Sequence, residues 1–299
     1  MPLPSLQPGT LWAALTARTE RALARGALLP IETVQTAIDD SGLRFVVRQV
    51  SSLIFKPRVD TAAPTPFVDP FLPYDPDLFV ADISATHVAL LNKYNVLPHH
   101  LLIVTRAFEP QQALVDLDDF VAWFTCLNEF DGLGFYNGGL EAGASQPHKH
   151  MQVVPLPLGE CGQSLPLAPL LEAATFDGPI GALPGFPFEH ALAQLTPGPV
   201  EQAAAQALDR YRMLLDVVGV GAMAVDGRAH HRTPYNLLLT PQWMLLVPRS
   251  SEAAAGISIN SLGFAGSFFV KDAEQLAALR RIGPMTLLLR VGLPRRRSA

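Results

Sequence analysis

Apolar and polar residues recur along the chain with two different periods, which predict helices and strands respectively. In residues 119–130, the aromatic residues Phe120, Trp123 and Phe124 repeat at the spacing that places side chains on one buried helical face. Apolar and charged positions are segregated in the same way near the amino terminus. By this criterion we predict further helices over residues 10–26, 200–218 and 270–281.

A shorter helix is predicted from Pro30 to the Ser41-Gly42 pair, because proline favours the first turn of a helix and glycine its end. Short alternating or continuous apolar runs predict strands instead. These strands span residues 43–50, 87–92, 99–105, 132–136, 148–155, 236–240 and 243–247. A turn at residues 95–98 joins the second and third of them, which suggests an antiparallel pair.

The order of these elements predicts an α+β fold with a largely antiparallel sheet flanked by helices. After Pro157 the composition becomes rich in leucine, proline and glycine, so we place a soft boundary near residue 160. Residues 1–160 then form the part that carries the chemistry described below. Residues 161–299 form a C-terminal α+β extension that packs on it, and the two parts can also form one compact unit.

A proline-rich segment separates the first strand from the second. Residues 57–76 contain six prolines, a composition that is typical of an extended linker. The same region also carries Phe67, Phe71 and Tyr74, which offer too much apolar surface for a solvated linker. We therefore expect an irregular segment that is docked onto the fold.

Composition and charge narrow the class of protein. The chain has 299 residues, a formal net charge of −5 and a pI of about 5.9, so it offers no basic face for nucleic acid. No apolar run approaches the roughly 20 residues of a membrane span, and the amino terminus lacks the features of a signal peptide. The two cysteines, Cys126 on a predicted helix and Cys161 in a loop, form no metal or disulfide spacing pattern. These features favour a cytoplasmic protein.

The candidate chemistry lies in one stretch, where a glycine-rich loop leads into a strand. The loop runs from Asn137-Gly-Gly through Gly143-Ala-Ser-Gln-Pro147, and consecutive backbone amides in such a loop can form a nest for an anion. Side chains on a strand alternate between its faces, so His148, His150 and Gln152 share one face. The stretch therefore combines a phosphate cradle with two imidazoles.

Three interpretations of His148-x-His150-x-Gln152 compete. It can be a half-exposed strand that carries two histidines without chemistry, since most histidines do none. It can be part of a metal site, but glutamine is a poor ligand and the sequence contains no His-Glu-x-x-His or Cys-x-x-Cys motif. It can also provide a nucleophile for phosphorus, in which a neutral imidazole attacks and a neighbouring group fixes its tautomer. The glycine-rich loop favours the third interpretation.

The run from Asn137 to Gln152 resembles the signature of the ATP adenylyltransferases, also called diadenosine tetraphosphate phosphorylases, in the histidine-triad (HIT-like) superfamily. Galactose-1-phosphate uridylyltransferases carry a similar His-Pro-His-x-Gln, but Lys149 and the Gly-Ala-Ser-Gln-Pro sequence before it match the adenylyltransferases better. The resemblance covers roughly residues 10–292. Further matching segments lie at residues 87–95, 100–106, 235–240, 243–249 and 259–266.

The resemblance implies a HIT-like fold and a nucleotidyltransferase that converts diadenosine tetraphosphate and phosphate into ATP and ADP. His150 would be the nucleophile, His148 would orient the site, and Gln152 would lie beside the transferred phosphoryl group. At Ser267 the chain departs from the methionine of the family. The nucleotide-binding residues that the resemblance implies are Lys56, Asn92, Lys93, Asn137, Gly143, Ala144, Ser145, Gln146, Asn260, Ser261, Leu262, Ser267 and Lys271.

The resemblance also implies the partners of the protein. They would be small molecules, namely diadenosine polyphosphates, ATP, ADP and phosphate, with no nucleic acid and no membrane. A divalent cation such as Mg²⁺ would accompany the nucleotide, without a dedicated protein metal site and without an organic cofactor. Lysine usage agrees with a polyphosphate ligand, because only four of the 22 basic residues are lysines and three of these, Lys56, Lys93 and Lys271, lie at matching positions. The fourth, Lys149, is predicted to point to the other face of its strand.

Two other functions compete with a transferase. A hydrolase of the same superfamily would pass the adenylyl intermediate to water, but Gln152 stands where such an enzyme has a third histidine. A non-catalytic nucleotide-binding module would have no use for His150 beside the phosphate loop. The sequence therefore favours the transferase over both.

Overall fold

A computed structural model describes residues 5–51, 68–159 and 164–295 of the chain. Its centre is a ten-stranded sheet, in the order β3-β4-β5-β7-β6-β13-β14-β10-β9-β8, with antiparallel neighbours. Because β6 pairs with both β7 and β13, strands from both sides of residue 160 belong to one sheet. These strands are β3 (Phe79–Asp82), β4 (His87–Leu91), β5 (Leu101–Thr105), β6 (Gly132–Gly138), β7 (His150–Pro155), β8 (Thr175–Asp177), β9 (Ile180–Ala182), β10 (Ala191–Gln194), β13 (Tyr235–Leu239) and β14 (Trp243–Pro248).

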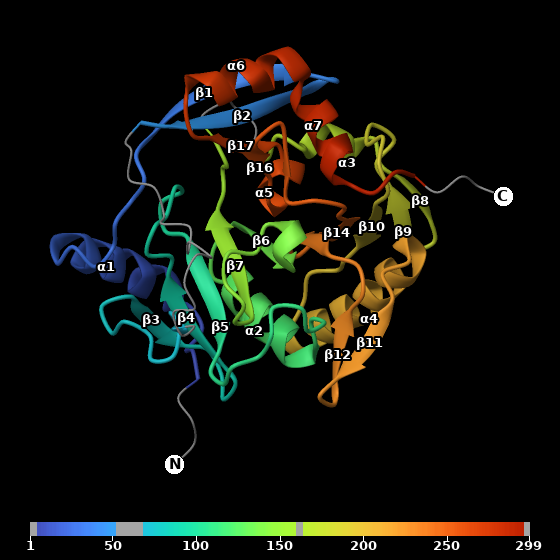
Figure 1. The fold of residues 1–299 in the computed structure, drawn as a ribbon. Helices are drawn as coiled ribbons and strands as arrows, with labels where there is room; N and C mark the ends of the chain where they lie inside the picture. Colours follow the sequence, from blue (N-terminus) through green and yellow to red (C-terminus); the bar gives the residue numbers. More distant parts are fainter. Residues whose placement is uncertain (1–4, 52–67, 160–163, 296–299) are drawn as a thin grey trace.

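Three helices cover one face of this sheet (Figure 1). They are α1 (Leu11–Ala24), α2 (Leu117–Leu127) and α4 (Val200–Val218), which confirms three of the predicted helices. Leu15, Trp123 and Leu214, one from each helix, are fully buried in the core that the helices share with the sheet. Helix α2 begins two residues earlier than predicted, because the carboxylates of Asp116 and Asp119 each accept a hydrogen bond from the other's backbone N–H.

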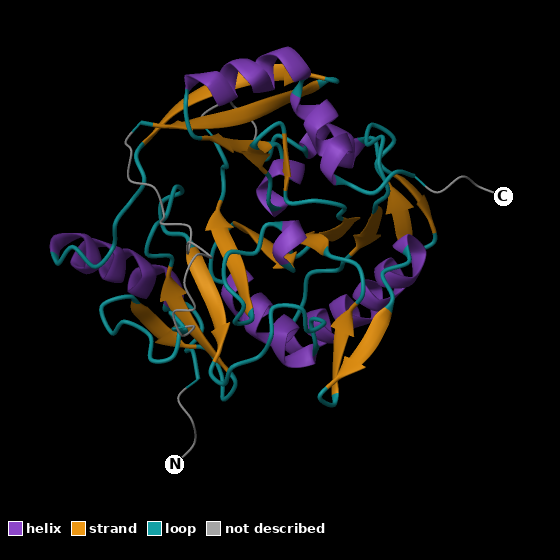
Figure 2. Cartoon of the chain, viewed as in Figure 1, coloured by secondary structure: helices purple, strands orange, loops and turns teal. Residues whose placement is uncertain are grey.

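A second layer covers the opposite face, and Figure 2 shows it above the large sheet. Phe135 of β6, Val154 of β7 and Phe268 of β17 belong to the core between the two layers. The helix predicted over residues 270–281 is confirmed as α6, and the apolar stretch that follows it forms α7. The layer consists of the sheet β1 (Thr33–Asp40), β2 (Leu43–Val50) and β17 (Ser267–Val270), with helices α5 (Ser261–Phe264), α6 (Ala273–Ile282) and α7 (Pro284–Val291). The remaining elements are short: η1 (Leu140–Ala142), α3 (Ala168–Glu172), and the hairpins β11 (Ala222–Val225)–β12 (Arg228–His231) and β15 (Ala253–Ala254)–β16 (Ile257–Ser258).

The helix predicted from Pro30 to Gly42 is wrong, because this segment forms strand β1. Ser41 and Gly42 have φ angles of 52° and 78°, the left-handed conformation that a tight two-residue hairpin turn requires. The turn returns the chain so that Asp40 pairs with Leu43 and β1 pairs with β2 along its whole length. Gly42 therefore marks a hairpin turn and not the end of a helix.

The described part of the proline-rich segment packs onto the large sheet, as predicted. Phe71 is 8% exposed and shares a small core with Val88 and Leu90 of β4 and with Leu102 and Val104 of β5. Residues 57–67 of the same segment lie outside the described residues. Phe71 therefore holds the described part of the segment against β4 and β5.

A buried ionic cluster joins β4, α2 and the residue before β7. Nε2 of His87 lies 3.0 Å from Oδ1 of Asp119, and the ammonium group of Lys149 pairs closely with Oδ2 of the same carboxylate. All three side chains are at most 2% exposed. Burial alone would raise the pKa of Asp119, but the hydrogen bond from His87 and the charge of Lys149 outweigh it and hold this pKa below its ordinary value.

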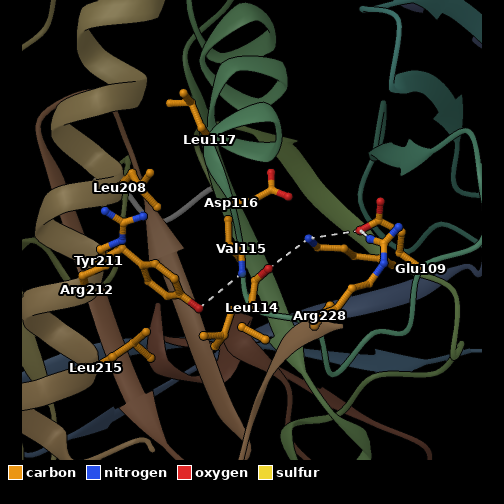
Figure 3. A pocket seen from close by; sticks show the side chains of 13 residues that line it. Glu109, Leu114, Val115, Asp116, Leu117, Leu208, Tyr211, Arg212, Leu215 and Arg228 are labelled. Atoms are coloured by element: carbon orange, nitrogen blue, oxygen red, sulfur yellow. Dashed lines mark hydrogen bonds and ion pairs between the residues drawn. The ribbon is translucent and has the colours of Figure 1, made fainter. Parts of the chain in front are cut away.

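A cavity of about 620 Å³ opens beside this cluster, between α2, α4 and β12. Glu109 and Arg228 form an ion pair at this cavity (Figure 3), and Lys149 also lines it. The ammonium group donates to the carbonyl oxygen of Leu114 at 3.0 Å and lies 3.7 Å from the Glu109 carboxylate. The Lys149 side chain therefore lies on the helical side of the sheet, on the face opposite to that of His150.

We expect Lys149→Ala to lower the free energy of unfolding by about 3–5 kcal/mol, because it leaves the buried Asp119 carboxylate without its main counter-charge. Urea denaturation at pH 7 measures the change. Lys271→Ala is the control, since Lys271 is exposed and its loss should change stability by no more than about 0.5 kcal/mol. Equal stabilities of the two variants would contradict the assigned role of the cluster.

The last residue of β12, His231, lies under the glycine-rich loop. A Cβ atom at Gly139 would stand 3.2 Å from Cε1 of His231, and the imidazole is only 7% exposed. Burial, together with the neighbouring His230, lowers the pKa of His231 to about 4. The ring is therefore neutral in the folded protein at physiological pH.

This lowered pKa predicts a loss of stability in acid. Between pH 6.5 and about 4 the unfolded chain protonates His231 and the folded chain does not, so falling pH stabilises the unfolded state and lowers the free energy of unfolding. The full window corresponds to about 3 kcal/mol. His231→Phe should therefore give a shallower dependence of the unfolding free energy on pH between 6.5 and 4.5 than the wild type. Parallel curves for the two proteins would rule out this contribution.

Candidate functional site

His150 is the first residue of β7, and its side chain lies on the face away from the helices. Met151 and Val153, which alternate with it, are fully buried in the helical core, whereas Val154 belongs to the opposite core. The predicted division of the strand into two faces is thus confirmed. Nδ1 of His150 lies 2.8 Å from the carbonyl oxygen of His148. A carbonyl only accepts, so Nδ1 carries the proton in the neutral ring and Nε2 carries the lone pair.

His148 precedes β7, which begins two residues later than predicted. It forms an isolated bridge with Pro110 instead of continuing the strand. Nδ1 of its fully buried ring lies 2.8 Å from Oδ2 of Asp69, and Nε2 lies 2.9 Å from the carbonyl oxygen of Thr105. The Thr105 hydroxyl also lies 2.9 Å from Nε2, so Nδ1–H donates to the carboxylate and Nε2 either donates to the carbonyl oxygen or accepts from the hydroxyl. His148 thereby ties the segment of Asp69 to the end of β5.

The segment that carries Asp69 also contacts the nucleophile candidate. The ring of Phe71 lies 5.6 Å from that of His148 and 5.4 Å from that of His150, between centroids. Phe71 thus forms an apolar wall beside His150, which is 4% exposed. Such a wall restricts the imidazole to few orientations.

A hydrogen-bonded chain orients Gln152. Oε1 of Gln152 lies 2.9 Å from Nε2 of His100, and Nδ1 of His100 lies 3.1 Å from Nδ2 of Asn92. The Asn92 amide donates to the imidazole, which in turn donates to the carbonyl oxygen of Gln152. The NH₂ group of the Gln152 amide therefore remains as a hydrogen-bond donor on the face that Gln152 shares with His150.

The glycine-rich loop is held at the end of β6 by a buried amide network. Oδ1 of Asn137 accepts hydrogen bonds from Nδ2 of Asn236 at 3.0 Å and from the backbone N–H and hydroxyl of Ser261 at 3.0 and 2.7 Å. Asn236 also donates to the carbonyl oxygen of Ala142 at 2.8 Å. The network thus connects β6, β13, η1 and the start of α5.

The close approach of the loop to α5 depends on Gly143. Gly143 has a φ of +88°, and a Cβ there would lie 3.0 Å from Cα of Asn260. The side chain of Asn260 caps α5 by accepting from the N–H of Leu262 at 3.0 Å. The loop and the N-terminus of α5 therefore lie directly against each other, with backbone N–H groups in both.

The buried side chain of Arg249 supports this hydrogen-bond network. The guanidinium of Arg249 donates to Oδ1 of Asn236 and to backbone carbonyl oxygens, including that of Ile259 at 2.9 Å. Burial lowers the pKa of Arg249 to about 9, so the group stays positively charged at neutral pH. Its charge-assisted hydrogen bonds hold the Asn236 amide in the orientation that Asn137 needs.

The structure brings many of the predicted ligand residues together around the loop. Asn137 contacts Ser261, Gly143 lies against Asn260, and the buried Leu262 is in α5. The loop itself carries the remaining candidates Ala144, Ser145 and Gln146.

The other predicted ligands are more widely placed. Lys93 is half-buried in the connection between β4 and β5, and Lys271 is exposed after β17. Ser267 is fully buried and accepts a hydrogen bond from Arg48 at 2.9 Å, so its hydroxyl is part of the second layer. Lys56 lies outside the described residues.

Several polar residues of the site were absent from the predicted set. They are Asp69, His100, Thr105 and Gln111. His100 is the second residue of a predicted strand, and a histidine beside an apolar run was the available signal for it. Nothing local to Asp69 or Gln111 in the sequence indicates their partners, because these partners lie 79 and 39 residues away.

The described residues carry neither a cluster of metal ligands nor a reactive thiol. No three His, Cys, Asp or Glu side chains gather there as a metal ion would need. No described helix has the length and apolar character to cross a bilayer. Cys126 is a free, fully buried thiol whose pKa is raised by burial, which makes it inert. Cys161 lies outside the described residues.

Comparisons with known proteins show the family and the fold of the chain. Residues 2–173 match the family model for the Ap4A phosphorylase N-terminal domain, and residues 184–294 match that for the ATP adenylyltransferase C-terminal domain. Diadenosine 5',5'''-P1,P4-tetraphosphate phosphorylase 2 of Saccharomyces cerevisiae is 30% identical over 263 residues, which cover 76% of each chain.

Solved structures are similar over nearly the whole chain. The crystal structure of yeast Ap4A phosphorylase Apa2 superposes with a TM-score of 0.79 at 24% identity, covering 97% of this chain and 99% of that one. Its complex with Ap4A gives a TM-score of 0.77 at 25% identity, with the same coverage. The α+β, HIT-like fold is thus confirmed. The chain belongs to the family of Ap4A phosphorylases and ATP adenylyltransferases.

Proposed function

We propose that this protein phosphorolyses diadenosine tetraphosphate (Ap4A) with inorganic phosphate to give ATP and ADP, through an adenylyl group on His150. The observation that carries this proposal is the bond from Nδ1 of His150 to the carbonyl oxygen of His148, which leaves the lone pair on Nε2 of the neutral ring. The yeast relative is named a diadenosine tetraphosphate phosphorylase, and Apa2 has been solved with Ap4A and with AMP. These names support Ap4A as the substrate of this chain.

In the first step Nε2 of His150 attacks the α-phosphorus of one adenylyl group, and the bond from that phosphorus to the bridging oxygen breaks. ATP leaves with the bonding electrons, and AMP remains attached to the imidazole. The negative oxygens of a polyphosphate repel any nucleophile, so positive groups must first balance their charge. We assign this task to the backbone N–H groups of the glycine-rich loop and to Lys56, Lys93 and Lys271.

In the second step an oxygen of inorganic phosphate attacks the same phosphorus and breaks its bond to Nε2. ADP leaves, and His150 returns to its neutral form with the proton still on Nδ1. The amide NH₂ of Gln152 can donate to a phosphoryl oxygen in both steps, because His100 occupies its Oε1. The reaction is reversible, since both steps exchange one phosphoryl bond for another of similar energy.

We also propose that a divalent cation such as Mg²⁺ arrives with the polyphosphate. Mg²⁺ prefers phosphate oxygens and retains several waters, so it needs no cage of protein side chains. It would offset part of the negative charge on the phosphates. The ligands of the protein are then free nucleotides and phosphate in the cytoplasm, in agreement with the acidic pI of about 5.9.

Replacement of the nucleophile should abolish the covalent intermediate. We expect His150→Ala to lower turnover of Ap4A by roughly 10⁴-fold or more, as the loss of a nucleophile usually does. Incubation with radiolabelled Ap4A in the absence of phosphate should leave label on the wild-type protein after denaturing gel filtration. His99→Ala is the control. Because His99 contacts Thr19 of α1, this variant should be labelled as strongly as the wild type. Equal labelling of His150→Ala and wild type would rule out His150 as the adenylated residue.

The identity of residue 152 should determine the acceptor. A glutamine amide cannot take a proton at neutral pH, so water is poorly activated and phosphate wins the second step. We expect the wild type to release far more ADP than AMP as phosphate rises. Gln152→His should raise the AMP share and slow total turnover, since an imidazole can act as a general base. Chromatography of both products over a phosphate titration makes the measurement, and abundant AMP from the wild type at saturating phosphate would identify a hydrolase instead.

A further inference from the structure

Strands β6 and β7 stop pairing just before the two residues that matter most for the site. Their last paired residues are Phe135 and Gln152, and continuation of the same register would set Asn137 opposite His150. Asn137 begins the glycine-rich loop, and His150 is the nucleophile. The gap between these two residues therefore sets the distance from the nucleophile to the phosphate loop.

The side-chain amide of Gln111 fills this gap. Its Oε1 accepts the backbone N–H of His150 at 2.9 Å, and its Nε2 donates to the carbonyl oxygens of Asn137 at 2.9 Å and of His150 at 3.3 Å. An N–H on one side and two carbonyl oxygens on the other permit only one orientation of the amide. Gln111 thus supplies by side chain the hydrogen bonds that the two strands would otherwise exchange directly.

Gln111 is itself rigidly held. The residue is 1% exposed, and its backbone N–H donates to the carbonyl oxygen of Pro147 at 2.7 Å. The hydroxyl of Tyr136, a residue of β6, donates to the carbonyl oxygen of Gln111. Next to it, the carbonyl oxygen of Glu109 accepts the N–H of Lys149 at 2.7 Å. The connection between β5 and α2 therefore runs as a partner along residues 147–149 and carries the amide into place.

We propose that Gln111 is a positioning residue for the adenylyl transfer, which keeps β6 and β7 apart at Asn137 and His150. This inference rests on the function proposed above. Without the amide, the carbonyl oxygen of Asn137 still accepts from the N–H of Gly139 at 3.0 Å, but the buried N–H of His150 loses the partner that Gln111 supplies. A further pair between the two strands would satisfy this N–H. Closure would move His150 toward the loop and displace the phosphates from Nε2. A displacement of about 1 Å is enough to reduce a rate by roughly 100-fold.

The first test uses a nearly isosteric variant with a distinctive pH dependence. In Gln111→Glu the carboxylate still accepts from His150, but its second oxygen faces the carbonyl oxygen of Asn137 and can donate only when protonated. We expect kcat/KM for Ap4A to fall about 100-fold at pH 8 and to recover, relative to wild type, as pH is lowered to 6. Gln112→Glu is the matched control, because Gln112 is the adjacent glutamine and its side chain is exposed. It should follow the wild-type profile.

The second test does not depend on activity. The His150 amide is bonded to Gln111, so its hydrogen exchange, followed by nuclear magnetic resonance, should be slow in wild type and in Gln112→Ala. In Gln111→Ala it should be at least 10-fold faster while exchange in α4 stays unchanged. If Gln111→Ala does not fold, the protection factor of the His150 amide, which corrects for the faster intrinsic exchange at higher pH, is compared in Gln111→Glu at pH 8 and at pH 6 instead. Wild-type exchange at His150 in the Gln111 variant, or wild-type rates in Gln111→Glu at pH 8, would overturn the proposal.

The two measurements also separate this proposal from the proposed function. A wild-type protein that does not convert Ap4A would refute the proposed function. Hydrogen exchange would still decide, independently of activity, whether Gln111 holds the backbone N–H of His150. An active wild type whose Gln111 variants are equally active would refute the positioning role alone.

Discussion

The site depends on one constraint, which is that buried backbone polar groups must be hydrogen-bonded. Where β6 and β7 diverge, the chain leaves a regular sheet inside the protein, and side chains must supply the bonds that the ladder no longer makes. Gln111 does so between Asn137 and His150. On β13, the strand on the other side of β6, the side-chain amide of Asn236 donates to the carbonyl oxygen of Ala142 in the loop. The amides that satisfy this opening are therefore the groups that set the distance between the glycine-rich loop and His150.

The two faces of β7 separate two electrostatic environments. On the helical side, the charges of Lys149 and Asp119 neutralise each other within a buried cluster. On the other side lies the imidazole of His150, with the apolar ring of Phe71 beside it. Because the paired charges face away, they impose little net field on the imidazole, and the polyphosphate becomes the dominant charge that the site must balance. Lys149 therefore anchors the strand, and the ligand-facing positive charge comes from other elements.

Much of the fold and the central part of the site could be predicted, because these features depend on local periodicity. The alternation along β7 alone placed His150 and Gln152 opposite Met151 and Val153, and the family resemblance added their roles. The failures were nonlocal. Strand β1 is defined by its pairing with β2, and Pro30 with Gly42 gave a misleading local signal. Asp69 and Gln111 act on histidines far along the chain, and Ser267 is bonded to Arg48 of another strand. No periodicity records such partners.

The same hydrogen bonds explain why a transferase suits this geometry. Activation of water needs a side chain that can accept its proton. Within the described residues, His148 is held between the carboxylate of Asp69 and the carbonyl and hydroxyl oxygens of Thr105, so both its nitrogens already have hydrogen-bond partners. Gln152 has no basic atom, and His100 already takes its carbonyl oxygen. His150 is occupied by the adenylyl group at the moment of the second transfer. Inorganic phosphate requires no such base, because at neutral pH it is already an anionic nucleophile and the positive groups that bind the leaving polyphosphate also attract it.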